Sequence, residues 1–171
     1  MPLTGLANAA VDRVAPDRGG FAATLAKYAE ADLACYRAEG PRTLVEWQSK
    51  SWGALLAWAR RRYDVDFTVT TGILHVDQPP ATVDRLAHEV AALDAFRLTG
   101  LSPLVTIGGS LIAALAILEG ALTAEDAWDA VSIDERWQLE KWGSDAEAEA
   151  ALALRHADFF SATRFLELLD V

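Results

Sequence analysis

The sequence of 171 residues contains a single cysteine, Cys35, so it cannot form an internal disulfide or a thiolate metal cluster. Lysine is also scarce, with 3 lysines against 12 arginines, and 25 acidic residues outnumber the 15 basic ones. The formal net charge is −10. A chain of this charge lacks the basic surface that holds phosphate backbones or anionic lipids. We therefore expect no nucleic-acid partner and no binding to membrane surfaces.

A targeting signal is not recognisable either. The first 14 residues contain Asp12 and Arg13 and no long apolar segment, unlike a secretory signal peptide. Residues 99–118 carry no charge over 20 positions, which is long enough to cross a bilayer, so a membrane-embedded protein is one alternative. Ser102 and Pro103, however, predict a helix start inside this segment and leave a helix that is short for a span. We expect a buried central helix and no membrane insertion.

Alanine is abundant, at 33 positions, while valine and isoleucine are comparatively few, a balance that favours helix over sheet. The hydrophobic pattern predicts a mainly α-helical bundle with a small β-hairpin or ribbon. Residues 1–171 are expected to form a single domain. Residues 1–79 should hold helices plus short strands near 32–37 and 67–71, and residues 80–171 should be entirely helical.

Several local signals predict where helices begin and end. Residues 43–63 read as one helix or as two helices broken at Gly53. Gly108 and Gly109 are expected in the middle of the uncharged helix, where glycine is tolerated if another element approaches closely. Capping pairs predict three further helix starts, and a glycine predicts one helix end: Thr123 with Asp126, Ser132 with Glu135, Ser144 with Glu147, and Gly143.

Signals of enzymatic chemistry are sparse. His88 begins a pattern like the zinc-protease HExxH helix, but Ala92 stands where the second histidine is required. His75 and Asp77 could share a metal, and with His88 they leave open the alternative of a small helical metal-dependent hydrolase. Cys35 lies in a predicted strand and is expected to be a buried, inert thiol. We expect no catalytic residues, no metal or cofactor site and no enzymatic activity.

The six tryptophans fall into two groups, within residues 47–58 and 128–142. Most are expected in the core, because an alanine-rich bundle needs large side chains to fill it. Trp137 and Trp142 lie among charged residues on a short predicted helix and are better candidates for contact with a partner. Glu140 lies near the C-terminus of that helix, where a negative charge is unfavourable. An acid placed against local preference is a candidate for function.

Five segments in a fixed order resemble the assembly chaperones of the F1 sector of ATP synthase that bind the free α subunit. The segments are PLTGLANAAVDRV (2–14), DLACYRAEGP (32–41), WGALLAWA (52–59), TGILHVDQP (71–79) and ERWQLEKWGSDAEAE (135–149). This family includes mitochondrial F1 complex assembly factor 2 and its α-proteobacterial homologues. The resemblance runs over essentially the whole chain.

The resemblance implies a chaperone without cofactors that keeps the unassembled α subunit from aggregating until the β subunit replaces it. It also implies a small N-terminal β domain, most of which is expected to be missing here. The functional acid beside the family's QxExWG motif maps onto Glu140, with Glu135 as the alternative, and Trp137, Gln138 and Trp142 complete the expected contact. We expect a monomer in the bacterial cytoplasm, or in the mitochondrial matrix if the protein is eukaryotic.

Overall fold

The computed structural model describes residues 1–170, which are mainly helical as the sequence predicts. Over these residues the helices are α1 (Pro2–Ala9), α2 (Arg18–Ala26), α3 (Arg42–Tyr63), α4 (Pro80–Ala91), α5 (Ala95–Gly108), α6 (Leu111–Leu118), α7 (Ala124–Val131), α8 (Ile133–Trp142) and α9 (Ala146–Leu169). The strands are β1 (Tyr36–Arg37) and β2 (Thr70–Thr71). Residues 80–170 contain only helices and their connections.

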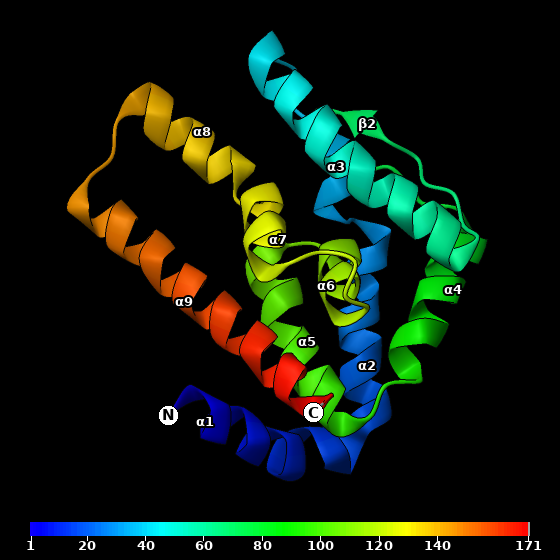
Figure 1. Cartoon of the computed structure of the whole chain (residues 1–171). Helices are drawn as coiled ribbons and strands as arrows, with labels where there is room; N and C mark the ends of the chain where they lie inside the picture. The colour runs from blue at the N-terminus through cyan, green and yellow to red at the C-terminus, as the bar shows by residue number, and fades with distance from the viewer. Residues whose placement is uncertain (171) are drawn as a thin grey trace.

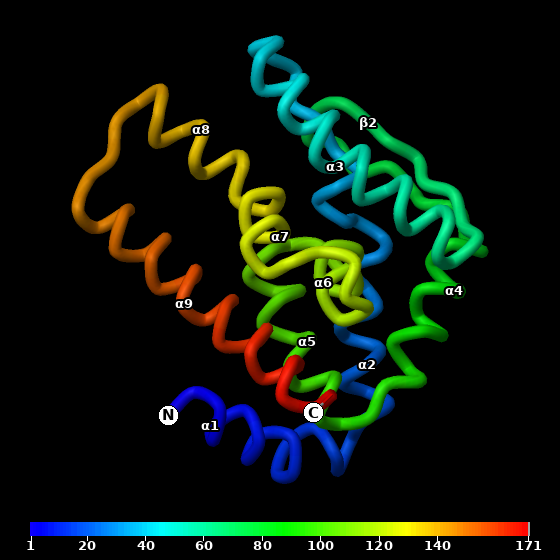
Figure 2. Tube along the Cα trace, viewed as in Figure 1, coloured from blue at the N-terminus to red at the C-terminus, as the bar shows by residue number. Residues whose placement is uncertain are grey.

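Helix α6 lies at the centre of the bundle, with the other helices arranged around it (Figure 1). Residues 111–117 are all buried, so this helix is apolar on every side because every side meets protein. Helix α5 packs beside α6 and against the second half of α9. Helix α8 leads away from this core, and α9 returns along the bundle, as the chain trace in Figure 2 shows. The two described ends of the chain lie at the same end of the molecule.

The uncharged segment 99–118 forms parts of two helices, not one. Helix α5 begins at Asp94, whose carboxylate accepts a hydrogen bond from the Arg97 amide at 2.8 Å, and it continues through Pro103. It ends at Gly109, whose φ of +71° is the left-handed conformation that suits glycine. The predictions of a helix start at residues 102–103 and of glycines in mid-helix are therefore wrong. None of the helices within residues 1–170 has the length and apolar character needed to cross a membrane.

The small β-ribbon is present, but its two strands run parallel and do not form a hairpin. Tyr36 pairs with Thr70 and Arg37 with Thr71, and α3 forms the connection between the strands. Only the last two residues of the predicted strand 32–37 are extended. The reason is that the Asp32 carboxylate accepts a hydrogen bond from the Ala34 amide, which turns the preceding residues into a short 3-10 helix.

The capping predictions for the last third of the chain are partly confirmed. Thr123 caps α7 by accepting a hydrogen bond from the Asp126 amide at 3.1 Å, and Gly143 ends α8. Ser132 makes no cap, because its hydroxyl donates to the Trp128 carbonyl at 2.6 Å. Asp145, one residue after the predicted Ser144, caps α9.

Gly100→Ala is expected to lower the free energy of unfolding by about 1–3 kcal/mol, because it overpacks the contact between α5 and α9. An added Cβ would lie 2.5 Å from Leu166 Cδ2 and 3.0 Å from Phe165 Cδ1. The control is Gly53→Ala, since no atom lies within 4 Å of its added Cβ and α3 continues through this position, contrary to the predicted break. Gly53→Ala should stabilise by about 1 kcal/mol. Urea denaturation of both variants checks this, and effects of the same sign would contradict it.

Candidate partner-binding site

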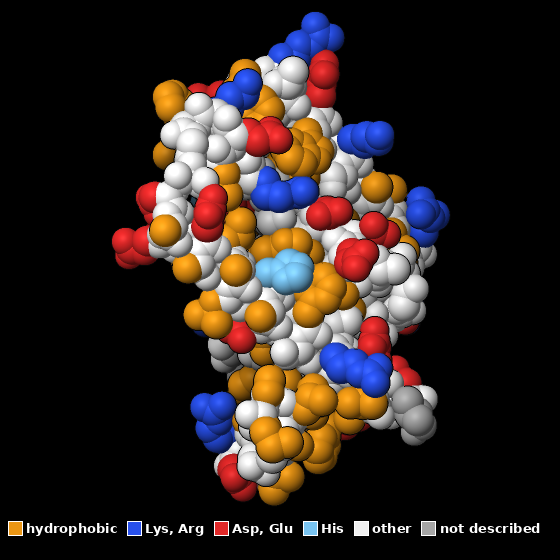
Figure 3. Space-filling model, turned by 60° about the vertical axis from the view of Figure 1, so that its left-hand side comes forward, with side chains coloured by type: hydrophobic (Ala, Val, Ile, Leu, Met, Phe, Trp, Pro, Cys, Tyr) orange, Lys and Arg blue, Asp and Glu red, His pale blue; other side chains and the backbone are white. Residues whose placement is uncertain are grey.

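Helix α8 and the first half of α9 form an exposed arm, defined here as residues 134–154. The arm is attached through Ile133, which is fully buried, and its outer residues 140–151 are all exposed. Figure 3 shows that hydrophobic and acidic side chains are interspersed on the face to which α8 and α9 contribute. Such a mixture leaves apolar surface available to a partner while charge keeps the arm hydrated.

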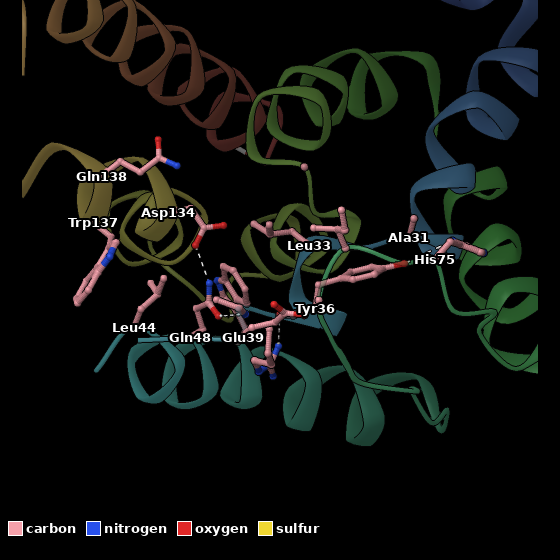
Figure 4. A pocket seen from close by; sticks show the side chains of 17 residues that line it. Ala31, Leu33, Tyr36, Glu39, Leu44, Gln48, His75, Asp134, Trp137 and Gln138 are labelled. Atoms are coloured by element: carbon pink, nitrogen blue, oxygen red, sulfur yellow. Dashed lines mark hydrogen bonds between the residues drawn. The ribbon is translucent and has the colours of Figure 1, made fainter. Parts of the chain in front are cut away.

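An open groove of about 1030 Å³ lies between α8, α3 and the segments around the two strands. Leu44 and Trp52 line it from α3, Leu33 lines it from the turn before β1, and Trp137 and Gln138 line it from α8. Figure 4 shows these segments meeting around the groove. The site therefore combines an apolar lining with residues that lie far apart in the sequence.

A buried glutamine fixes α8 relative to α3. The Gln48 side chain is 2% exposed, donates from Nε2 to Asp134 Oδ1 at 2.7 Å, and accepts from the Ala38 amide at 2.8 Å (Figure 4). Buried amides are stabilised only when such partners are present. Sequence reasoning missed Gln48 and Asp134. The signal was there, because Gln48 interrupts the apolar stripe formed by Leu44 and Trp52 at intervals of four residues.

The four predicted contact residues fall into two pairs. Trp137 is half-buried and lines the groove together with the exposed Gln138, and the Lys141 Nζ lies 4.9 Å from the Trp137 ring centroid. Glu140 and Trp142 do not line the groove, and the Trp142 side chain is 86% exposed. The structure thus brings Trp137 and Gln138 together with α3 and leaves Glu140 and Trp142 on the free surface of the arm.

The two candidate acids have different surroundings. Glu135 is half-buried and forms an ion pair with Arg155 of α9 at 2.8 Å, so its charge connects the two helices of the arm. Glu140 is exposed, and over residues 1–170 it takes part in no ion pair or side-chain hydrogen bond. The charge of Glu140 is therefore the one available to a partner.

The other tryptophans are mainly structural, as the sequence predicts. Trp52 and Trp128 are buried, and Trp47 and Trp58 are half-buried against the core. The Trp52 indole Nε1 donates to the Ala130 carbonyl at 2.7 Å and so connects α3 with α7. Trp142 is the exception to this structural role, because its side chain is 86% exposed.

The residues of the metal-site alternative do not converge. His75 Nε2 lies 3.0 Å from Asp77 Oδ1 and its Nδ1 lies 3.4 Å from the Tyr36 hydroxyl, whereas His88 is exposed on α4. In the part of the chain that the structure describes, no three His, Cys, Asp or Glu side chains are grouped to hold a metal ion. Cys35 is buried, and burial raises the pKa of its thiol to about 12, which disfavours the nucleophilic thiolate.

Comparison with known proteins places this geometry in a family. The sequence model of a family described as "ATP12 chaperone protein" matches residues 1–60. The crystal structure of Atp12 from Paracoccus denitrificans is 43% identical in sequence, with a TM-score of 0.95, over 98% of this chain and 72% of that one. This chain belongs to the ATP12 chaperone family. The resemblance seen in the five sequence segments is thereby confirmed.

Two further structures agree with membership of the ATP12 family. An aspartate-to-lysine variant of the Paracoccus Atp12p is 42% identical, with a TM-score of 0.95 and the same coverage of both chains. The Atu1473 protein of Agrobacterium tumefaciens is 35% identical with a TM-score of 0.92, over 99% of this chain and 63% of that one. Because the match to ATP12 structures spans nearly all of this chain, it includes both the groove and the arm.

Proposed function

We propose that this protein is an assembly chaperone for the F1 sector of ATP synthase, which binds the unassembled α subunit and prevents its aggregation until the β subunit replaces it. The observation that carries the proposal is the 43% identity to the Paracoccus Atp12 across 98% of this chain. It acts as a chaperone and not as an enzyme, within one helical domain over residues 1–171, in the bacterial cytoplasm.

The exposed arm supports this function. Tryptophan side chains are frequent anchors of protein interfaces, and Trp142 presents most of its surface to solvent at the end of α8. Glu140 lies two residues earlier with its charge unpaired among the described residues, and acidic groups beside an apolar contact steer association and set its orientation. Together with Trp137 and Gln138, these residues form the proposed contact.

The direct test is capture of the isolated α subunit. Purified protein should retain the α subunit on an affinity resin and reduce the light scattering that accompanies its aggregation. Addition of the β subunit should release the captured α subunit. Folded protein that neither retains the α subunit nor suppresses its aggregation would remove the proposed function.

Glu140→Lys is expected to weaken binding of the α subunit by about tenfold or more, because reversal of an interface charge replaces attraction with repulsion. The melting temperature should stay nearly unchanged, since Glu140 is exposed and unpaired within residues 1–170. Titration calorimetry and thermal denaturation measure the two effects. A collapse in stability would instead assign Glu140 a structural role.

Two controls separate the site from general charge. Asp84→Lys makes the same kind of charge reversal on the exposed surface of α4 and should leave binding unchanged. Glu135→Gln removes the ion pair with Arg155 and should cost about 0.2–1 kcal/mol of stability with little effect on binding. If Glu135→Gln weakens binding more than Glu140→Lys does, Glu135 is the functional acid.

A further inference from the structure

The floor of the groove between α3 and α8 is apolar. Glu140 and Trp142, at the exposed end of the arm, do not line this groove. Leu44 is 8% and Trp52 1% exposed, and the half-buried Leu33 extends the same apolar lining. The groove volume of about 1030 Å³ is at the upper end of the range for binding pockets, so it can hold several side chains of another molecule.

Two apolar side chains stand in solvent at the rim of this groove. Ile73 and Leu74, in the loop that follows β2, are 99% and 81% exposed, and Ile73 contributes to the lining. Neighbouring large apolar residues with this exposure are typical of surfaces that a partner covers. The accessible apolar surface of this site therefore comes from the rim and from the half-buried Leu33, above a floor that is nearly closed.

The free charge in the groove is negative. Glu39 lines it and forms no ion pair over residues 1–170, and Asp134 lines it with only the Gln48 amide as a side-chain partner there. Arg37, the cation among the lining residues, is 9% exposed and donates from one nitrogen to the carbonyls of Ala34 and Tyr36 at 2.7 and 2.8 Å. These bonds hold the guanidinium against the backbone but do not remove its charge, so two carboxylates against one guanidinium leave the lining with a net negative charge.

We propose that this groove binds a segment of the unassembled client in which a large apolar side chain is flanked by arginine or lysine. The apolar side chain packs against Leu33, Ile73 and Trp137, the lining residues with accessible apolar surface, and the basic groups reach Glu39 and Asp134. The identity of the client rests on the proposed function above. Charge complementarity selects this occupant over a nucleic acid, which the two carboxylates repel, and over a second copy of this chain, whose net charge is −10.

Three short synthetic peptides test the groove directly: alternating leucine and arginine, leucine and glutamate, and serine and arginine. The protein has six tryptophans, so its indole N–H signals in a nitrogen–proton correlation spectrum report where each peptide binds. Only the leucine–arginine peptide should saturate, with its main shift at Trp137 and little change at the exposed Trp142. Equal binding of the serine–arginine peptide, a main shift at Trp142, or no binding of any peptide would each overturn the proposal.

Glu39→Arg should weaken binding of the leucine–arginine peptide by about tenfold, and Glu39→Gln by less, while Asp84→Lys leaves it unchanged. Capture of the α subunit by the same variants distinguishes the two proposals. If wild-type protein captures the α subunit and Glu39→Arg captures it equally well, the groove proposal fails and the proposed function stands. If the peptide occupies the groove but the α subunit is not captured, the proposed function fails and the groove remains a site for basic, apolar segments.

Discussion

Asp32→Ala is expected to lower the free energy of unfolding by about 3–5 kcal/mol, because it leaves several buried donors without an acceptor. Asp32 is fully buried. Its carboxylate accepts hydrogen bonds from the Ala34 amide at 3.0 Å, the Ser110 hydroxyl at 2.7 Å and the Ile112 amide at 3.0 Å. These bonds join the turn before β1 to the start of the central helix α6, so their loss affects two elements. Urea denaturation measures the change.

The matched control is Asp17→Ala, which removes the same group from an exposed helix cap. The Asp17 carboxylate caps α2 by accepting a hydrogen bond from the Gly20 amide at 3.2 Å. Loss of such a cap costs about 1 kcal/mol. A comparable loss in both variants would mean that burial adds nothing at Asp32.

The titration of Asp32 gives a second test. Burial raises the pKa of its carboxyl above the ordinary value of 3.8, although the hydrogen bonds from Ile112, Ser110 and Ala34 oppose this shift. The folded state therefore holds the proton more tightly than the unfolded state. The stability from this difference is fully present below about pH 3.8 and is lost as the pH rises through the folded pKa.

Asp32→Asn has nearly the same shape and does not titrate at this position. The stability of wild-type protein relative to this variant should therefore fall as the pH rises from acid toward neutrality. The other carboxyl groups are common to both proteins and cancel in the comparison. Denaturation at a series of pH values measures the difference, and a constant difference would contradict a raised pKa for Asp32.

The elements that the sequence predicts well depend on neighbouring residues. Thr123 caps α7 and Gly143 ends α8, as their local patterns predict, and the structure shows the same kind of local chemistry where α4 begins at Pro80 and Asp94 caps α5. In these cases the chemistry lies within about one helical turn, so a short stretch of sequence contains all of it.

The failed predictions involve competition between local signals or contacts across the chain. Ser110, and not Ser102, caps a helix. Gly109 takes the left-handed conformation just before it, and the Asp32 carboxylate accepts a hydrogen bond from the Ser110 hydroxyl. Ser132 has the sequence of a capping residue but donates to the Trp128 carbonyl one turn earlier. A serine hydroxyl can serve either role, and tertiary packing decides between them.

The candidate site was predictable only in part for the same reason. Trp137 and Gln138 could be singled out on one short helix, but the groove they line requires α3 and the strand segments. The hydrogen bond that joins α3 to α8 beside this groove connects Gln48 with Asp134, 86 positions apart in the sequence. Periodicity places Gln48 on the buried face of α3, yet it does not identify the partner on α8.

Trp52→Ala and Trp142→Ala remove the same side chain, but we expect only Trp52→Ala to lower the free energy of unfolding substantially. Trp52 is 1% exposed, donates to the Ala130 carbonyl at 2.7 Å and has the Arg37 guanidinium 5.6 Å from its ring centroid. Its removal should cost about 3–5 kcal/mol of unfolding free energy. Trp142 is 86% exposed, so its removal should change stability by less than about 0.5 kcal/mol. Urea denaturation compares the two.

For binding of the α subunit the order of the two positions should be reversed, with the larger loss of affinity at Trp142. Trp142→Ala should weaken it by about tenfold or more if the indole anchors the client, while the fold stays intact. Should Trp52→Ala fail to fold, Trp52→Phe keeps an aromatic ring and loses the hydrogen bond to Ala130, at a cost of about 1–3 kcal/mol. Unchanged binding by Trp142→Ala would remove it from the contact. Because the deleted group is the same at both positions, any difference between the variants measures its surroundings: the core for Trp52 and the client for Trp142.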